Sequence, residues 1–65
     1  MKNKGFCAVL KAKKVNEKAL VEVLGITGKD LRLWKSGKVR PHILYVKEMS
    51  KLFEMNLEEL WRVFK

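Results

Sequence analysis

The sequence predicts an all-α fold, in which five short helices form a single domain over residues 1–65. Three observations lead to this prediction. In each of five segments, apolar residues recur three and four positions apart, which is the spacing of one face of an α-helix. Asparagine or threonine stands before three of these segments, where its side-chain oxygen can cap the first free amides. Glycine follows two of them, at the place where helices commonly end.

The first two expected helices cover residues 5–14 and residues 17–24. Asn16 is the expected N-cap of the second helix, and Glu17 directly after it suits the positive end of the helix dipole. The residues expected to face inward are Phe6, Val9, Leu10, the aliphatic stem of Lys13, Leu20, Val23 and Leu24.

A sharp turn is expected between the second helix and the third. Gly25 stands where a left-handed residue would end the second helix, because that conformation costs glycine nothing. Thr27 and Asp30 then form the T-x-x-D pattern of a capping box, which predicts a third helix over residues 28–36. Leu31 and Trp34 share the inner face of this helix, and Gly37 ends it.

Two further helices are expected after a loop at residues 39–41, where a proline disfavours helical angles in the residue before it. The fourth helix covers residues 43–53, with His42 at its start. Its inner face consists of Ile43, Val46, Met49, Ser50 and Phe53. Asn56 is the expected cap of the fifth helix, whose apolar stripe consists of Leu57, Leu60, Trp61 and Phe64.

The connection between the second and third helices is short enough to set them at a steep angle. The third helix then projects from the domain. In helix-turn-helix proteins, a helix placed in this way enters the major groove of DNA, and the helix before it lies across the backbone.

Positive charge is concentrated in the first part of the chain. The formal net charge is +8, from 15 Lys and Arg against 7 Asp and Glu. Residues 1–40 contain 11 basic and 3 acidic residues, whereas residues 41–65 contain 4 of each. The whole excess of positive charge therefore lies in the first 40 residues, which favours a polyanionic partner. Nucleic acid is the first candidate and an acidic membrane surface the second, while an ordinary solvated lysine face is the alternative without a partner.

Residues 13–60, "KKVNEKALVEVLGITGKDLRLWKSGKVRPHILYVKEMSKLFEMNLEEL", resemble the Cro and phage-repressor type of helix-turn-helix domain, also called the XRE family. The resemblance rests on the ordered spacing of Leu20, Leu24-Gly25-Ile26-Thr27, Leu31, Trp34, Gly37-Lys38, Pro41, Met49-Ser50 and the closing "NLEEL". It implies a compact five-helix lambda-repressor-like domain and a transcriptional regulator. Proteins of this family usually bind double-stranded operator DNA as homodimers.

Carried over from the family, the base-facing positions are Thr27, Gly28, Lys29, Arg32 and Leu33. Lys29 and Arg32 can donate to the O6 and N7 acceptors of guanine, Arg32 with two nitrogens at once. Leu33 can contact a thymine methyl group, or alternatively pack on a neighbouring helix or at a subunit surface. Gly28 allows close approach of the backbone, and Thr27 divides its hydroxyl between capping and a phosphate.

The expected phosphate contacts are Asn16, Lys18, Lys35, Lys38 and Arg40, with Lys13 and Lys14 as supplements. Two residues depart from the family pattern. Glu17 stands where glutamine is usual, and a carboxylate cannot donate to a phosphate. We expect it to cap the helix or to pair with Lys14 or Lys18. Val21 stands where alanine is usual, and either it shifts the angle between the helices or Gly28 makes room for it.

Four apolar residues of the fourth and fifth helices are candidates for a dimer contact, namely Trp61, Phe64, Tyr45 and Leu52. The alternative for Trp61 and Phe64 is that they extend the core. A self-association surface near at least one of them would agree with the two-fold symmetry expected on an operator.

No enzyme is expected, because one His, one Asp, one Cys and two Ser residues offer no convincing set of nucleophile, base and orienting group. The sequence also lacks a metal cluster and a phosphate-binding glycine loop, so no cofactor, metal or small-molecule ligand is expected. Cys7 is expected to be a small buried residue. The apolar runs are too short for a bilayer span or a signal peptide, which favours a cytoplasmic protein. The alternative function is a protein-binding module, such as an antitoxin or an adaptor that kept the fold.

Overall fold

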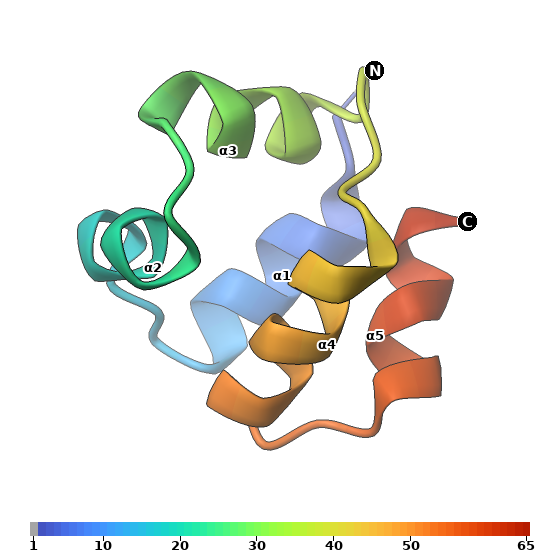
Figure 1. The fold of residues 1–65 in the computed structure, drawn as a ribbon. Helices are drawn as coiled ribbons and strands as arrows, with labels where there is room; N and C mark the ends of the chain where they lie inside the picture. The colour runs from blue at the N-terminus through green and yellow to red at the C-terminus, as the bar shows by residue number, and fades with distance from the viewer. Residues whose placement is uncertain (1) are drawn as a thin grey trace.

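The computed structural model describes residues 2–65, and every regular element in this range is an α-helix. Figure 1 shows the five helices in chain order: α1 (Lys4–Ala12), α2 (Glu17–Leu24), α3 (Gly28–Ser36), α4 (Ile43–Leu52) and α5 (Leu57–Phe64). The prediction of an all-α fold with five helices is confirmed.

Each helix begins at a side chain that accepts a hydrogen bond from a backbone amide of the first turn. In chain order these caps are Asn3, Asn16, Thr27, His42 and Asn56. His42 accepts through Nδ1, which lies 3.1 Å from the amide of Leu44. The caps supply partners for amides that have none inside the helix, which is why such short helices have defined starts.

Two expectations for the first two helices are wrong. The first helix ends at Ala12 and not at residue 14. Lys13 is its exposed C-cap, and Lys14 adopts a left-handed φ of 52°, which does not continue a helix. The stem of Lys13 therefore does not extend the apolar stripe. Val23 does not face inward either, since 62% of it is exposed. Val21 packs against the core in its place.

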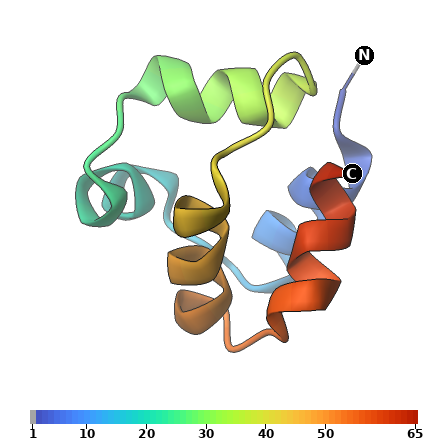
Figure 2. The same ribbon diagram turned by 45° about the vertical axis from the view of Figure 1, so that its right-hand side comes forward.

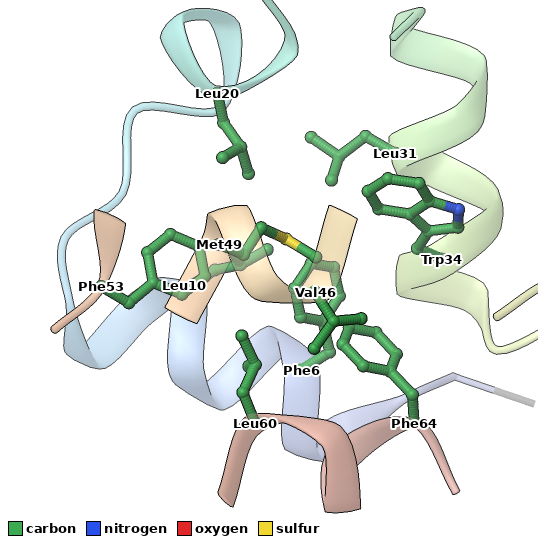
Figure 3. Packing of buried hydrophobic residues seen from close by; sticks show 10 residues of the cluster. All are labelled: Phe6, Leu10, Leu20, Leu31, Trp34, Val46, Met49, Phe53, Leu60 and Phe64. Carbon is green, nitrogen blue, oxygen red and sulfur yellow. The ribbon is translucent and has the colours of Figure 1, made fainter. Parts of the chain in front are cut away.

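The core lies between the helices and draws on all five of them. Figure 3 shows its ten buried apolar residues, Phe6, Leu10, Leu20, Leu31, Trp34, Val46, Met49, Phe53, Leu60 and Phe64. The rings of Phe6 and Phe64 lie 4.8 Å apart between centroids, which joins α1 to the end of α5. Burial of these side chains supplies most of the driving force for folding.

Helix α3 forms one end of the molecule, as the views in Figures 1 and 2 agree. α2 meets it at a steep angle, and α1, α4 and α5 lie on the same side of α3 as α2 does. α1 contacts both α3 and α5, and α4 packs against α5. One long side of α3 is therefore held by the core, and its opposite side faces away from the protein.

Candidate nucleic-acid interface

The corner between α2 and α3 has the geometry of a helix-turn-helix. Gly25 is left-handed, with φ 68° and ψ 32°, and ends α2. The amide of Ile26 donates to the carbonyl of Val21 over 3.1 Å, which closes the end of the helix. Thr27 and Asp30 form the predicted capping box, in which each side chain accepts from the other residue's amide over 3.1 Å. These hydrogen bonds fix the direction in which α3 leaves the turn.

The two sides of α3 differ in chemistry. Leu31 and Trp34 are buried, and the Trp34 ring lies 5.6 Å from that of Tyr45 on α4. Lys29 and Arg32 are exposed on the outer side of the helix, and Leu33 is half-buried. The side chains predicted to face DNA bases are thus separated from those that anchor the helix.

Arg32 lies at the centre of the outer side, because it borders three adjoining open hollows. The first, of about 410 Å³, is also lined by Lys29, Leu33, Ser36 and Lys38. The second, of about 360 Å³, is also lined by Lys2, Lys35 and Ser36. The third, of about 350 Å³, extends to the start of α2 and includes Glu17 and Lys18. We call these cations the basic face: Lys2, Lys18, Lys29, Arg32, Lys35 and Lys38.

Lys2 is a member of this face that no motif in the sequence indicates. Asn3 holds the segment in place, because its amide donates to the carbonyl of Lys35 over 2.8 Å. The side-chain nitrogen of Asn3 also donates to the carbonyl of Val63 over 3.0 Å. The N-terminal segment is thus tied to the ends of α3 and α5, and the only signal in the sequence was the excess of basic residues.

The predicted phosphate-binding residues are in different states. Lys18, Lys38 and Arg40 are exposed. The side-chain oxygen of Asn16 accepts from the amide of Ala19 over 3.1 Å, so it is engaged as a cap. Lys35 is half-buried and forms an ion pair with Glu17 over 3.0 Å. The expectation that Glu17 pairs with Lys14 or Lys18 is therefore wrong, because the steep crossing of the helices brings the end of α3 to the start of α2.

Gly28 and Val21 border the same hollow between α2 and α3. A β-carbon at Gly28 would meet no atom within 4 Å, so the space there is open. Val21 is half-buried against the core, and it borders the same hollow as Gly28 without filling it. The interpretation that Gly28 makes room for Val21 stays a prediction.

The candidates for a dimer contact separate into two groups. Phe64 is 3% exposed and packs on Phe6, so its assignment to a dimer surface is wrong. It belongs to the core of the domain, which was the alternative. Trp61 and Tyr45 are half-buried against the core, while Leu52 is 49% exposed.

Among residues 2–65, no three His, Cys, Asp or Glu side chains come close enough together to hold a metal ion. The expectation that Cys7 is buried is only partly met, since Cys7 is half-buried with its Sγ 3.8 Å from the carbonyl of Lys35. No helix in the described range is long and apolar enough to cross a membrane.

No protein-family model matches the chain, and no curated protein and no solved structure was found to match it.

Proposed function

We propose that the protein is a sequence-specific DNA-binding transcriptional regulator, of the Cro or phage-repressor kind, which places α3 in the major groove of operator DNA. The observation that carries the proposal is the two-sided character of α3. Leu31 and Trp34 fix one side to the core, while Lys29 and Arg32 stand exposed on the other side at the centre of the basic face.

The dimensions of α3 support this placement. Its nine residues give a length of about 13 Å at 1.5 Å per residue. An α-helix with side chains is about 10–12 Å across, which matches the width of the major groove of B-DNA. The helix presents its outer side to base edges over a few base pairs, with Arg32 in the middle.

The side chains divide into two roles. Arg32 and Lys29 donate to guanine O6 and N7, and Leu33 contacts a thymine methyl group. Lys18 and Lys38 contact phosphates of the two strands beside the groove, helped by Arg40 and by the amide nitrogen of Asn16. The hydroxyl of Thr27 is engaged with Asp30, so Thr27 acts chiefly by orienting the helix.

The protein binds as a homodimer, so that two copies of α3 enter successive major grooves about 34–36 Å apart. The exposed side chain of Leu52 and the half-buried Tyr45 and Trp61 are the apolar residues available for contact between copies. A near-palindromic operator with this half-site spacing is the expected target.

The test is selection of bound duplexes from a random pool, followed by footprinting and by titration at several salt concentrations. Each neutralised phosphate contributes roughly −0.9 to the slope of log K against log salt concentration, so Lys18, Lys38 and Arg40 from both protomers give a slope of about −5. Arg32→Ala is expected to lose about 1–3 kcal/mol of discrimination at one base pair, whereas Lys38→Ala weakens all duplexes alike.

Lys51→Ala is the matched control, because Lys51 is also an exposed cation and lies near the end of α4, which is remote from α3 (Figure 1). It should leave affinity and slope nearly unchanged. Absent duplex binding, or binding that does not depend on salt, would contradict the proposal. A tight protein partner that covers Lys29 and Arg32 would favour a protein-binding module instead.

A further inference from the structure

An ion pair links the two helices of the helix-turn-helix within the basic face. Lys35 Nζ, near the end of α3, donates to both carboxylate oxygens of Glu17, each at 3.0 Å. Glu17 is the first residue of α2. This ion pair is the only one among residues 2–65, and its two partners lie 18 positions apart in the sequence.

Both partners stand where a DNA backbone would approach. Lys35 borders a hollow with Lys2 and Arg32, and Glu17 borders the adjoining hollow with Lys18 and Arg32. Their side chains are 31% and 46% exposed, so a phosphate group could reach either of them. Glu17 is therefore an anion placed among cations, since Lys35 lies 3.0 Å from its carboxylate and Lys18 and Arg32 border the same hollow.

The other acidic residue of this region has a different function. The carboxylate of Asp30 accepts from the amide of Thr27 and completes the capping box. The cap of α2 is supplied by Asn16, whose side chain accepts from Ala19. The local start of α2 is thus capped without the carboxylate of Glu17, whose hydrogen-bond partner is Lys35.

We propose that Glu17 sets the DNA affinity of this protein by holding Lys35, which is a latent phosphate-binding residue. The inference rests on the proposed function. The Lys35 ammonium uses two of its three N–H donors on the carboxylate of Glu17. A phosphate must take the one remaining donor or displace the carboxylate, so Lys35 gains little by binding it. While Lys35 stays paired with Glu17 it neutralises no phosphate and releases no condensed counterion from DNA, and it is that release which drives phosphate binding.

The consequence is a weaker sequence-independent contact. Phosphate contacts strengthen specific and non-specific binding alike, since they carry no sequence information. Restraining one phosphate contact lowers the affinity for non-specific DNA, while Arg32 and Lys29 keep their base contacts. Because an exposed ion pair is weak in water, Glu17 lowers the contribution of Lys35 without locking it away.

The experiment compares the wild type with Glu17→Ala, Lys35→Ala and the double variant on the selected duplex. Glu17→Ala is expected to bind several-fold more tightly and to steepen the salt slope by up to about 0.9 per protomer, since Lys35 is then free to neutralise a phosphate. The double variant has the net charge of the wild type and should return to its affinity and slope. Glu17→Gln repeats the test with a side chain of the original size.

A scan of neutral methylphosphonate substitutions in the duplex supplies the specific readout. One additional phosphate per half-site should become sensitive in Glu17→Ala, and this sensitivity should disappear in Glu17→Ala/Lys35→Ala. Glu22→Ala is the matched control, because Glu22 is an exposed carboxylate on α2 that borders none of the three hollows. It makes the same change in net charge.

Three outcomes would overturn the inference: unchanged or weaker binding by both Glu17 variants, an equal gain in Glu22→Ala, or a new phosphate contact that survives removal of Lys35. In each of these cases the salt-dependent binding of the wild type still stands. If the wild type binds no duplex, it is the proposed function that fails.

Discussion

The left-handed corner at Gly25 predicts that two similar glycine substitutions, three positions apart, have opposite effects on stability. Gly25 has φ 68°, and a β-carbon there would meet no atom within 4 Å. Gly28, the first residue of α3, also has open space around a β-carbon, but its φ is not positive. Neither substitution creates a clash, so the two alanine variants differ only in backbone conformation.

The magnitudes follow from two opposing terms. Alanine restricts the unfolded chain relative to glycine, which stabilises a protein by about 0.4–1 kcal/mol where the native angles suit it. At Gly25 the left-handed angles cost an L-residue roughly 1–2 kcal/mol in the folded state. Gly25→Ala should therefore lower the free energy of unfolding by about 1 kcal/mol, and Gly28→Ala should raise it by about 0.4–1 kcal/mol. The unfolded-state term cancels between the variants, so their difference measures the strain.

The assay is thermal or urea unfolding followed by circular dichroism, with the fluorescence of the two tryptophans as a second probe. A change of 1 kcal/mol shifts the Tm of a domain of this size by about 4–8 °C, so the two variants should differ by roughly 4–16 °C. If Gly25→Ala were as stable as Gly28→Ala, residue 25 would not be left-handed, and the account of the corner would be refuted.

Two further substitutions test the packing and the N-terminal segment. Leu60→Ala should lower the free energy of unfolding by about 2–5 kcal/mol, because Leu60 is 0% exposed. Leu52→Ala, at a site 49% exposed, should change it by no more than about 0.5 kcal/mol. Urea unfolding compares the two variants, and equal losses of stability would contradict the assignment of the core. Asn3→Ala should lower the free energy of unfolding by about 1–2 kcal/mol, since it removes the N-cap of α1 and the side-chain hydrogen bond to the Val63 carbonyl. Thermal unfolding measures this loss, and a neutral Asn3→Ala would show that the segment is not tied down.

Local signals were enough to predict where most helices begin and turn. Asn16, Thr27 and Gly25 act within four residues of their own position, so their effect can be read from the neighbouring sequence. Asn3 was missed because much of its role is not local. Its side chain reaches the carbonyl of Val63, 60 positions away, and the backbone amide reaches that of Lys35.

The inner face of a short helix was harder to predict than its ends. In α2, the spacing of Leu20 and Leu24 fits either Val21 or Val23 as the third inward residue. Which of them is buried depends on where α3 crosses, and the structure packs Val21 and leaves Val23 exposed. In α5, the same spacing did not show that Phe64 would meet Phe6 on α1, because that contact joins the two ends of the chain.

The candidate site was predictable where it depends on one helix and not where it depends on several. Lys29 and Arg32 follow from the position and phase of α3. The place of Lys2 on the basic face and the pairing of Glu17 with Lys35 depend on tertiary contacts. A count of charges along the sequence does not show which residues these contacts bring together. Sequence neighbours favoured Lys14 or Lys18, but the crossing of α2 and α3 places Lys35 closer to the carboxylate.

Stability and DNA affinity are expected to respond to Glu17 in opposite directions. Several cations lie close together on the basic face, and their mutual repulsion opposes folding. Glu17 offsets this repulsion through its ion pair with Lys35 and through its place at the positive end of α2, each contributing at most about 1 kcal/mol at low salt. Its removal should therefore lower the Tm while DNA binding becomes tighter. A residue that acted only by holding the fold would lower both quantities together, so the opposite signs distinguish control of Lys35 from a structural role.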